Sequence, residues 1–147
     1  MPNHSRVLLQ FVLAVLVTTL VGSILQTQYN LAQLQALGAP MPIDVRVETT
    51  CLDVLGFSPI FAILVLLGFA AALPVAAWLS KKIPSARWLL FALAGGLAIF
   101  LGLTLANAAL PMPTFIGANR SFVGTLGLMA SGSVGALFFA IRCRTAE

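Results

Sequence analysis

Four long apolar stretches, each free of charged side chains, dominate the pattern of hydrophobic and polar positions along the chain. They extend from Val7 to Gln26, from Ile60 to Leu79, from Trp88 to Asn107 and from Phe122 to Ile141. A helix of about 20 residues, rising about 1.5 Å per residue, crosses a hydrocarbon core about 30 Å thick. The pattern therefore predicts an all-α fold, an integral membrane four-helix bundle that forms a single transmembrane domain.

Serine and proline residues mark the expected ends of these helices. Ser58 is placed to cap the second helix, with a proline following it, and Ser85 and Ser121 are placed to cap the third and fourth. Pro74 lies inside the second stretch and is expected to kink that helix unless neighbouring groups satisfy the freed carbonyl.

The segment between the first two stretches, residues 27–58, is expected to be a structured outer loop that caps the bundle. Its first part, residues 29–37, has leucines at helical spacing and stops before Gly38, as a short helix on the membrane surface would. From Ile43 to Glu48 apolar and charged positions alternate, which favours a half-buried strand. A spacing of four from Ile43 onwards competes with that interpretation. We expect the extended form because prolines precede it.

Composition excludes a water-soluble domain. Hydrophobic residues make up 60% of the chain and charged residues 8%, with a mean hydropathy of +1.04, whereas soluble domains carry roughly 25% charged residues. The formal charge of +4 would suggest nucleic acid in a soluble protein. Here the basic residues lie where they act as topology determinants, so we expect no nucleic-acid partner.

The distribution of lysine and arginine predicts the orientation. Two basic residues, Arg46 and Arg120, lie on one side of the expected membrane. The other six lie on the opposite side: Arg6, Lys81, Lys82, Arg87, Arg142 and Arg144. The positive-inside rule makes the richer side cytoplasmic. We therefore expect a multi-pass protein of the cell membrane, inner or plasma, with both termini in the cytoplasm and an uncleaved first helix.

Chemically active groups are scarce. No Asp, Glu, Lys, Arg or His lies within the four stretches, although ion-coupled transporters usually need such groups in the membrane. Cys51 and Cys143 are expected on opposite sides of the membrane, and neither belongs to a metal-spaced pair. The sequence thus predicts no cofactor, no metal site and no catalytic residues, and favours a protein without enzymatic activity.

Small residues recur at helical spacing on the spans. On the fourth stretch they are Gly124, Gly127, Ser131 and Gly135, and the third contributes Gly95 and Gly102. Such residues allow helix backbones to approach closely, which drives association in lipid. We expect them to pack within the bundle, with a homodimer seam through the fourth helix as the alternative.

Charged and amide side chains gather at the expected outer surface. The first loop contributes Asp44, Arg46, Glu48 and Asp53, and the second region contributes Asn107, Asn119 and Arg120. An extended segment would place Asp44, Arg46 and Glu48 on one face. These groups form either solvated ion pairs or a binding site for a lipid head group or partner. We expect at least one arginine to pair with a first-loop carboxylate and tie the two loops together.

One tripeptide occurs in both outer loops. Residues 40–42 and residues 111–113 both read Pro-Met-Pro. The recurrence suggests two parallel helix-loop-helix repeats, although loops favour proline and coincidence is the simpler explanation.

Two functions remain for this pattern. The first is a non-enzymatic interaction or assembly protein that binds a partner protein, a second copy of itself or membrane lipid through its outer cap and small-residue faces. The alternative is a carrier or scramblase-like pathway for an uncharged or amphipathic solute. Its polar residues would be Gln10, Thr18, Gln26, Thr104 and Asn107. The ligand, the partner and the oligomeric state are left open.

Overall fold

A computed structural model of the chain describes residues 3–110 and 117–144. The elements in chain order are α1 (His4–Ala36), α2 (Ile43–Gly56), α3 (Ser58–Lys82), η1 (Pro84–Ala86), α4 (Arg87–Ala109), η2 (Gly117–Arg120) and α5 (Phe122–Arg144). No strand occurs within this described part. Helix α1, helix α3, the segment Pro84–Ala109 that contains α4, and helix α5 are each long and apolar enough to cross a membrane. The all-α, four-span bundle is thereby confirmed.

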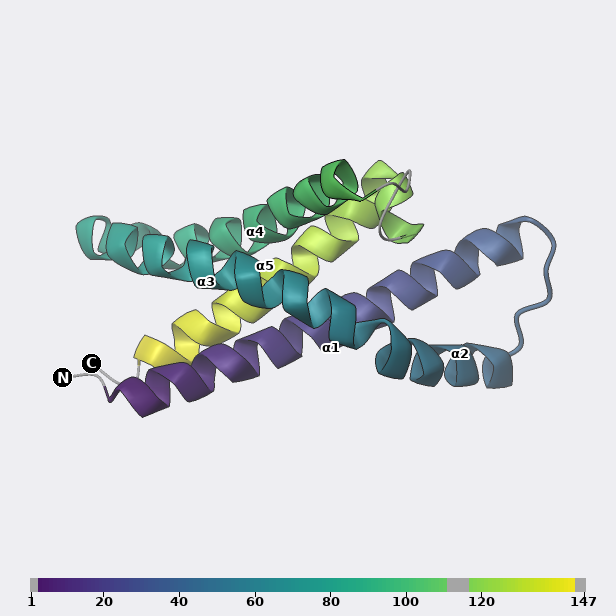
Figure 1. Cartoon of the computed structure of the whole chain (residues 1–147), viewed down its shortest axis with the longest axis horizontal. Coiled ribbons are helices and arrows are strands. Elements are labelled where there is room, and N and C mark those ends of the chain that lie inside the picture. Colours follow the sequence, from purple (N-terminus) through teal and green to yellow (C-terminus); the bar gives the residue numbers. More distant parts are fainter. Residues whose placement is uncertain (1–2, 111–116, 145–147) are drawn as a thin grey trace.

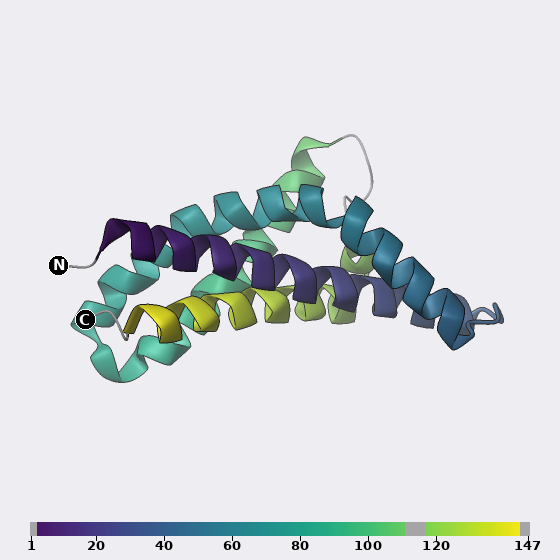
Figure 2. The ribbon, with the colours of Figure 1, turned by 90° about the horizontal axis from the view of Figure 1, so that it is seen from below.

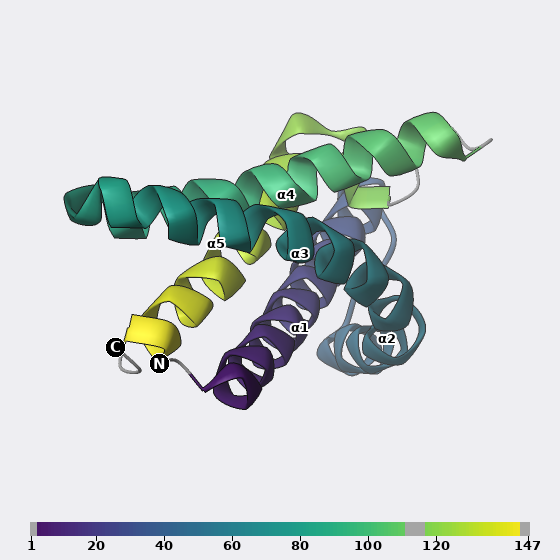
Figure 3. The same cartoon turned by 60° about the vertical axis from the view of Figure 1, so that its left-hand side comes forward.

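The four spanning helices form a ring of neighbours. Helix α4 packs against α3 and α5, and α1 completes the ring by packing against α5 and α3. In Figure 3 the pair α3 and α4 crosses over the pair α1 and α5. The start of α1, the end of α5 and the α3–α4 turn lie at one end of the bundle, here called the terminal end (Figure 1). Helix α2 lies at the opposite end, here called the hairpin end.

Aromatic and aliphatic side chains fill the centre of the bundle. The largest fully buried ones include Phe61, Phe69, Phe91, Ile99 and Leu128. The outer faces are also apolar, because many leucines and isoleucines of the spans are exposed. A water-soluble bundle would carry polar side chains on those faces, so the distribution is that of a protein surrounded by lipid.

The segment between the first two spans is helical, which corrects two predictions. Residues 29–37 do not form a separate surface helix, because α1 continues without a break to Ala36. Residues 43–48 are the first part of α2 rather than a strand, so the competing spacing of four was the correct interpretation. A lone strand would leave its backbone groups unpaired, whereas a helix satisfies them internally. Pro42, with φ −66° and ψ 162°, ends the extended stretch and precedes the first helical turn.

Helix α2 leads into α3 through one residue. Phe57 has helical dihedral angles, φ −84° and ψ −39°, so the chain bends there without forming a loop. Figure 2 shows α2 turning away from the axis of α3 and following the far end of α1. This antiparallel pair, the distal part of α1 and α2 (residues 27–56), is called the outer hairpin below.

The capping predictions have mixed outcomes. Ser121 caps α5 as predicted, since its Oγ accepts a hydrogen bond from the Gly124 N–H at 3.0 Å. Ser85 lies within η1, and Ala86 precedes α4 instead. Ser58 is already the first residue of α3, whose N-cap position is Phe57. Pro74 lies inside α3 and does not end it.

Candidate interaction surfaces

The two helices of the outer hairpin are held together by polar side chains. The Arg46 guanidinium donates to Gln28 Oε1 at 3.2 Å and to Gln35 Oε1 at 2.6 Å. Gln28 Nε2 in turn donates to Thr50 Oγ1 at 2.9 Å. Arg46 therefore joins two turns of α1 to α2. Hydrogen bonds to a charged group are worth more than neutral ones, so this contact helps to hold the hairpin together.

A second polar contact lies nearer to the bundle. The Thr27 hydroxyl donates to Asp53 Oδ2 at 2.7 Å, and Thr27 is 1% exposed. The contacts of residues 27, 28 and 35 on α1 with residues 53, 50 and 46 on α2 run antiparallel. Helix α2 thus follows α1 away from the bundle.

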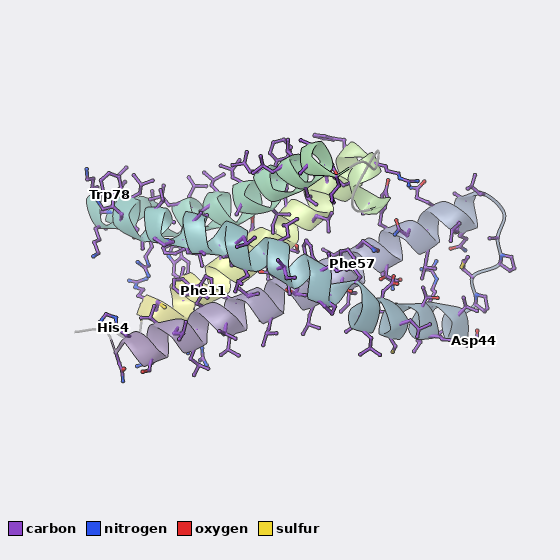
Figure 4. All side chains as sticks on the ribbon, viewed as in Figure 1. His4, Phe11, Asp44, Phe57 and Trp78 are labelled. Carbon is purple, nitrogen blue, oxygen red and sulfur yellow. The ribbon has the colours of Figure 1, made fainter. Side chains whose placement is uncertain are left out.

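The opposite face of α2 is exposed and largely apolar. Ile43 is 80%, Val47 58% and Leu55 76% exposed, and none of the residues of α2 is buried. Asp44 and Glu48 are exposed on the same side. Figure 4 shows Asp44 at the tip of the hairpin. Ile43, Asp44, Val47, Glu48, Cys51, Leu52 and Leu55 form what is called the α2 outer face below.

The polar and apolar side chains of α2 are therefore arranged in the reverse of the order seen in an amphipathic helix pair in water. Such a pair normally buries its apolar stripes against each other and exposes charged side chains. Here the polar side chains Arg46, Thr50 and Asp53 point toward α1, whereas Ile43 and Leu55 point away. Burial of apolar surface is the main source of association energy, so the α2 outer face has the composition of a contact surface.

The helical conformation of α2 separates the acidic from the basic residues of the predicted cluster. At about 100° per residue, Asp44 and Glu48 share a face of α2, and Arg46 lies on the opposite side. The two hydrogen bonds of Arg46 go to amide oxygens of α1, so the predicted carboxylate pairing is wrong in its case. The pairing of Arg120, which is exposed in η2, stays a prediction.

Hydroxyl groups connect the two outer segments. Tyr29 on α1 and Ser121, the capping residue of α5, share a hydrogen bond between their hydroxyl oxygens. Beside it, Thr125 donates to Asn119 Oδ1 at 2.7 Å. Tyr29 was missed by sequence reasoning; it is the single tyrosine of the chain, which was the available signal. Asn107, the remaining residue of the predicted cluster, is half-buried near the end of α4.

The small residues mark where helices approach most closely. A Cβ added at Gly135 would overlap Thr18 of α1, and one at Gly124 would overlap the Ala118 carbonyl. Gly102 faces Leu64, whose Cδ2 would lie 2.9 Å from an added Cβ. Ser131 is fully buried and donates to Leu128 O at 2.5 Å. These four positions pack within the bundle.

The closest helix crossing pairs a predicted residue with one that was missed. Added Cβ atoms at Gly95 of α4 and at Gly132 of α5 would each overlap the backbone carbonyl of the other residue. Nearby, the Ser133 hydroxyl donates to Ala92 O at 2.8 Å. An added Cβ at Gly127 would meet no described atom within 4 Å, so the expectation that Gly127 packs against another helix of the bundle is wrong.

The polar side chains of the alternative solute pathway do not form a continuous row. Gln10, Thr18 and Gln26 are buried on α1, but Thr104 is exposed on α4 and donates to the Phe100 carbonyl of its own helix at 2.8 Å. These side chains therefore do not line one path.

An apolar groove of about 880 Å³ lies between α3 and α4. Small residues such as Gly68, Ala71 and Ala98 lie among its lining, with larger side chains such as Leu67 and Leu101 beside them. This is called the α3–α4 groove below.

The predicted Pro-Met-Pro repeat stays a prediction. Residues 40–42 lie between α1 and α2, but residues 111–113 lie outside the described residues. Within the described ranges, no group of three or more His, Cys, Asp or Glu side chains is placed to hold a metal ion.

Comparison with protein-family models, curated proteins and solved structures finds no match to the chain.

Proposed function

We propose that this protein is a non-enzymatic membrane interaction protein that binds the extramembrane part of a different protein through the α2 outer face. The observation that carries the proposal is the inverted organisation of the outer hairpin. Arg46, Thr50 and Asp53 of α2 form hydrogen bonds with α1, and the apolar side chains of the α2 outer face are left for another surface.

The geometry of α1 favours a protein partner over the bilayer surface. Its 33 residues extend over about 50 Å, which exceeds the hydrocarbon core by about 20 Å. Because α2 follows α1 away from the bundle, Ile43 at its start lies farther from the spans than Leu55 near its end. A helix that stands off the membrane cannot bury its whole length in the interface, as a helix lying flat would.

Charge favours a different protein over a second copy. The α2 outer face contains Asp44 and Glu48 and no basic residue. Pairing this face with itself would bring like charges together around the apolar centre, which disfavours a symmetric dimer. A partner surface with apolar residues flanked by lysine or arginine complements it.

The orientation belongs to the same proposal. With two basic residues on the hairpin side of the spans and six at the terminal end, the hairpin projects to the outside of a cell membrane and both termini are cytoplasmic. Cys51 is exposed and should react with a membrane-impermeant thiol reagent added to intact cells. Labelling of Cys143 and not Cys51 would reverse the orientation.

Site-specific photo-cross-linking tests the partner directly. A photoreactive amino acid at Val47, on the α2 outer face, should give one discrete heteromeric product in intact membranes. The matched control is Leu16, which is 49% exposed on α1 within the first span and should give no such product. The partner should join through a segment with basic residues. Products with twice the mass of the chain, or with lipid alone, would contradict the proposal.

A further inference from the structure

The α3–α4 groove is lined by apolar side chains of two spanning helices, whereas the α2 outer face also contains Asp44 and Glu48. The lining runs from Ile60 to Leu79 on α3 and from Leu90 to Ala109 on α4, nearly the length of both helices. The small side chains make the groove deeper between the larger ones, on a surface that faces lipid.

Two lysines and a tryptophan stand at the end of this groove near the α3–α4 turn. Lys81 and Lys82 lie in the last turn of α3, at the terminal end, and both are exposed. Lys82 follows the lining residue Leu79 by three positions, so it continues the same helix face. Its Nζ lies 4.1 Å from the centre of the Trp78 ring, which is 56% exposed. Figure 4 shows Trp78 at this end of the molecule.

A half-buried arginine holds this end of the groove in place. Arg87, at the start of α4, donates to Ala140 O at 3.2 Å and to Ser80 Oγ at 3.4 Å. It joins α4 to both α5 and α3 near the turn. Arg87 is thereby committed to the protein, whereas the two lysine ammonium groups remain directed to the surroundings.

No carboxylate offsets these lysines among the described residues. Three of the four acidic residues, Asp44, Glu48 and Asp53, belong to α2 at the hairpin end, and the fourth, Glu147, lies outside the described ranges. The groove is thus apolar along its length and positively charged at one end.

We propose that the α3–α4 groove binds one anionic phospholipid, with an acyl chain along the small-residue floor and the head group at Lys81 and Lys82. The assignment rests on the match between a one-ended charge and a molecule with one anionic end. Basic pockets between membrane helices bind anionic head groups, and each lysine near the surface contributes about 1 kcal/mol. Trp78 stands at the depth where indole rings meet head groups. This inference is independent of the α2 outer face.

A membrane-spanning partner helix fits the groove less well. Such a helix would fill the groove, but an apolar helix would make no use of the exposed positive charge of Lys81 and Lys82 at its end. A second copy would bring Lys81 and Lys82 to an interface that already has an excess of positive charge at this end.

Native mass spectrometry of the full chain with defined lipids provides the test. The protein, released from the same detergent, is incubated with phosphatidylglycerol or phosphatidylcholine of equal chain length. One phosphatidylglycerol should be retained in preference to phosphatidylcholine. The double variant Lys81→Gln/Lys82→Gln should lose that preference, by about fivefold per lysine at low ionic strength. Ala71→Trp, which fills the floor, should reduce the retention of both lipids.

Matched variants separate this site from general attraction to a basic surface. Arg6→Gln/Arg144→Gln removes the same charge from the same end but outside the groove, and it should keep the preference. Leu16→Trp adds bulk on the exposed side of α1 and should leave retention unchanged. If Ala71→Trp does not give a monodisperse protein, Ala94→Phe fills the groove from α4.

Three results would overturn the proposal. The first is equal retention of both lipids by the unmodified chain. The second is an equal loss of preference in the two charge variants. The third is efficient disulfide cross-linking of two copies through Ala71→Cys in a background without Cys51 and Cys143, which would place a second copy in the groove.

Discussion

The spanning bundle and the outer hairpin are both built from antiparallel helices, but they are held together by opposite chemistry. In the bundle, Gly95 and Gly132 allow backbones to touch, and most side chains are apolar both inside and outside, with a few buried hydroxyl and amide groups such as Thr18 and Ser131 among them. In the hairpin, Arg46 bridges two glutamines and the apolar side chains face outward. Lipid cannot distinguish apolar side chains from itself, so shape holds the bundle together. The hairpin uses hydrogen bonds and leaves its hydrophobic surface for an external contact.

The largest expected effect follows from the shape dependence of the bundle. Gly132→Leu would force α5 away from α4, because even a Cβ would overlap the Gly95 carbonyl. We expect destabilisation of about 3 kcal/mol or more, at the upper end of overpacking effects. Thermal unfolding in detergent measures it. The matched control is Gly127→Leu on the same helix, where space is open and the change should be neutral or stabilising by up to about 1 kcal/mol. Equal effects at both positions would contradict this account of the α4–α5 crossing.

A smaller and local effect is expected in the hairpin. Arg46→Ala removes both charge-assisted hydrogen bonds to α1, each worth about 1.5–3 kcal/mol when shielded and less at this partly exposed position. Hydrogen exchange of the α2 amides should accelerate, with exchange in α3, α4 and α5 unchanged. Glu48→Ala, an exposed change in the same helix, is the control. Unfolding of the bundle together with α2 would show that the two regions are not separate.

The smallest effect concerns the link between the two regions. Ser121→Ala removes the α5 cap and the hydrogen bond to Tyr29, and caps are worth about 1 kcal/mol. Exchange should accelerate at the start of α5. Tyr29→Phe removes the bond and keeps the cap, so it should have the lesser effect. A greater effect of Tyr29→Phe would assign the link a larger role than the cap.

The same comparison explains how far sequence reasoning reached. Hydropathy predicted the four spans because a helix surrounded by lipid must be apolar along its whole length in the membrane. It failed at Ile43–Glu48 because Asp44, Arg46 and Glu48 mimic the alternation of a strand, and the prolines before them outweighed the competing spacing of four.

Details within the candidate surfaces depend on helix rotation. Gly127 and Gly132 are both small residues on one helix, and the positions of α1 and α4 decide which one packs closely against a neighbouring helix. The bond between Tyr29 and Ser121 joins residues 92 positions apart, which no local pattern encodes. The groove likewise arises from the placement of two helices, although Lys81 and Lys82 were counted among the basic residues on the expected cytoplasmic side.

The most direct test of the central claim measures folding and association on one variant. Ile43→Ser/Leu55→Ser makes the α2 outer face polar at two exposed positions, where substitutions change stability by about 0.5 kcal/mol or less. Truncating central contact residues costs about 2 kcal/mol or more in binding, about thirtyfold in affinity. The account predicts an unchanged melting temperature and at least a tenfold loss of the heteromeric cross-link from Val47. An unchanged cross-link, or a melting temperature that falls in proportion to it, would contradict the account.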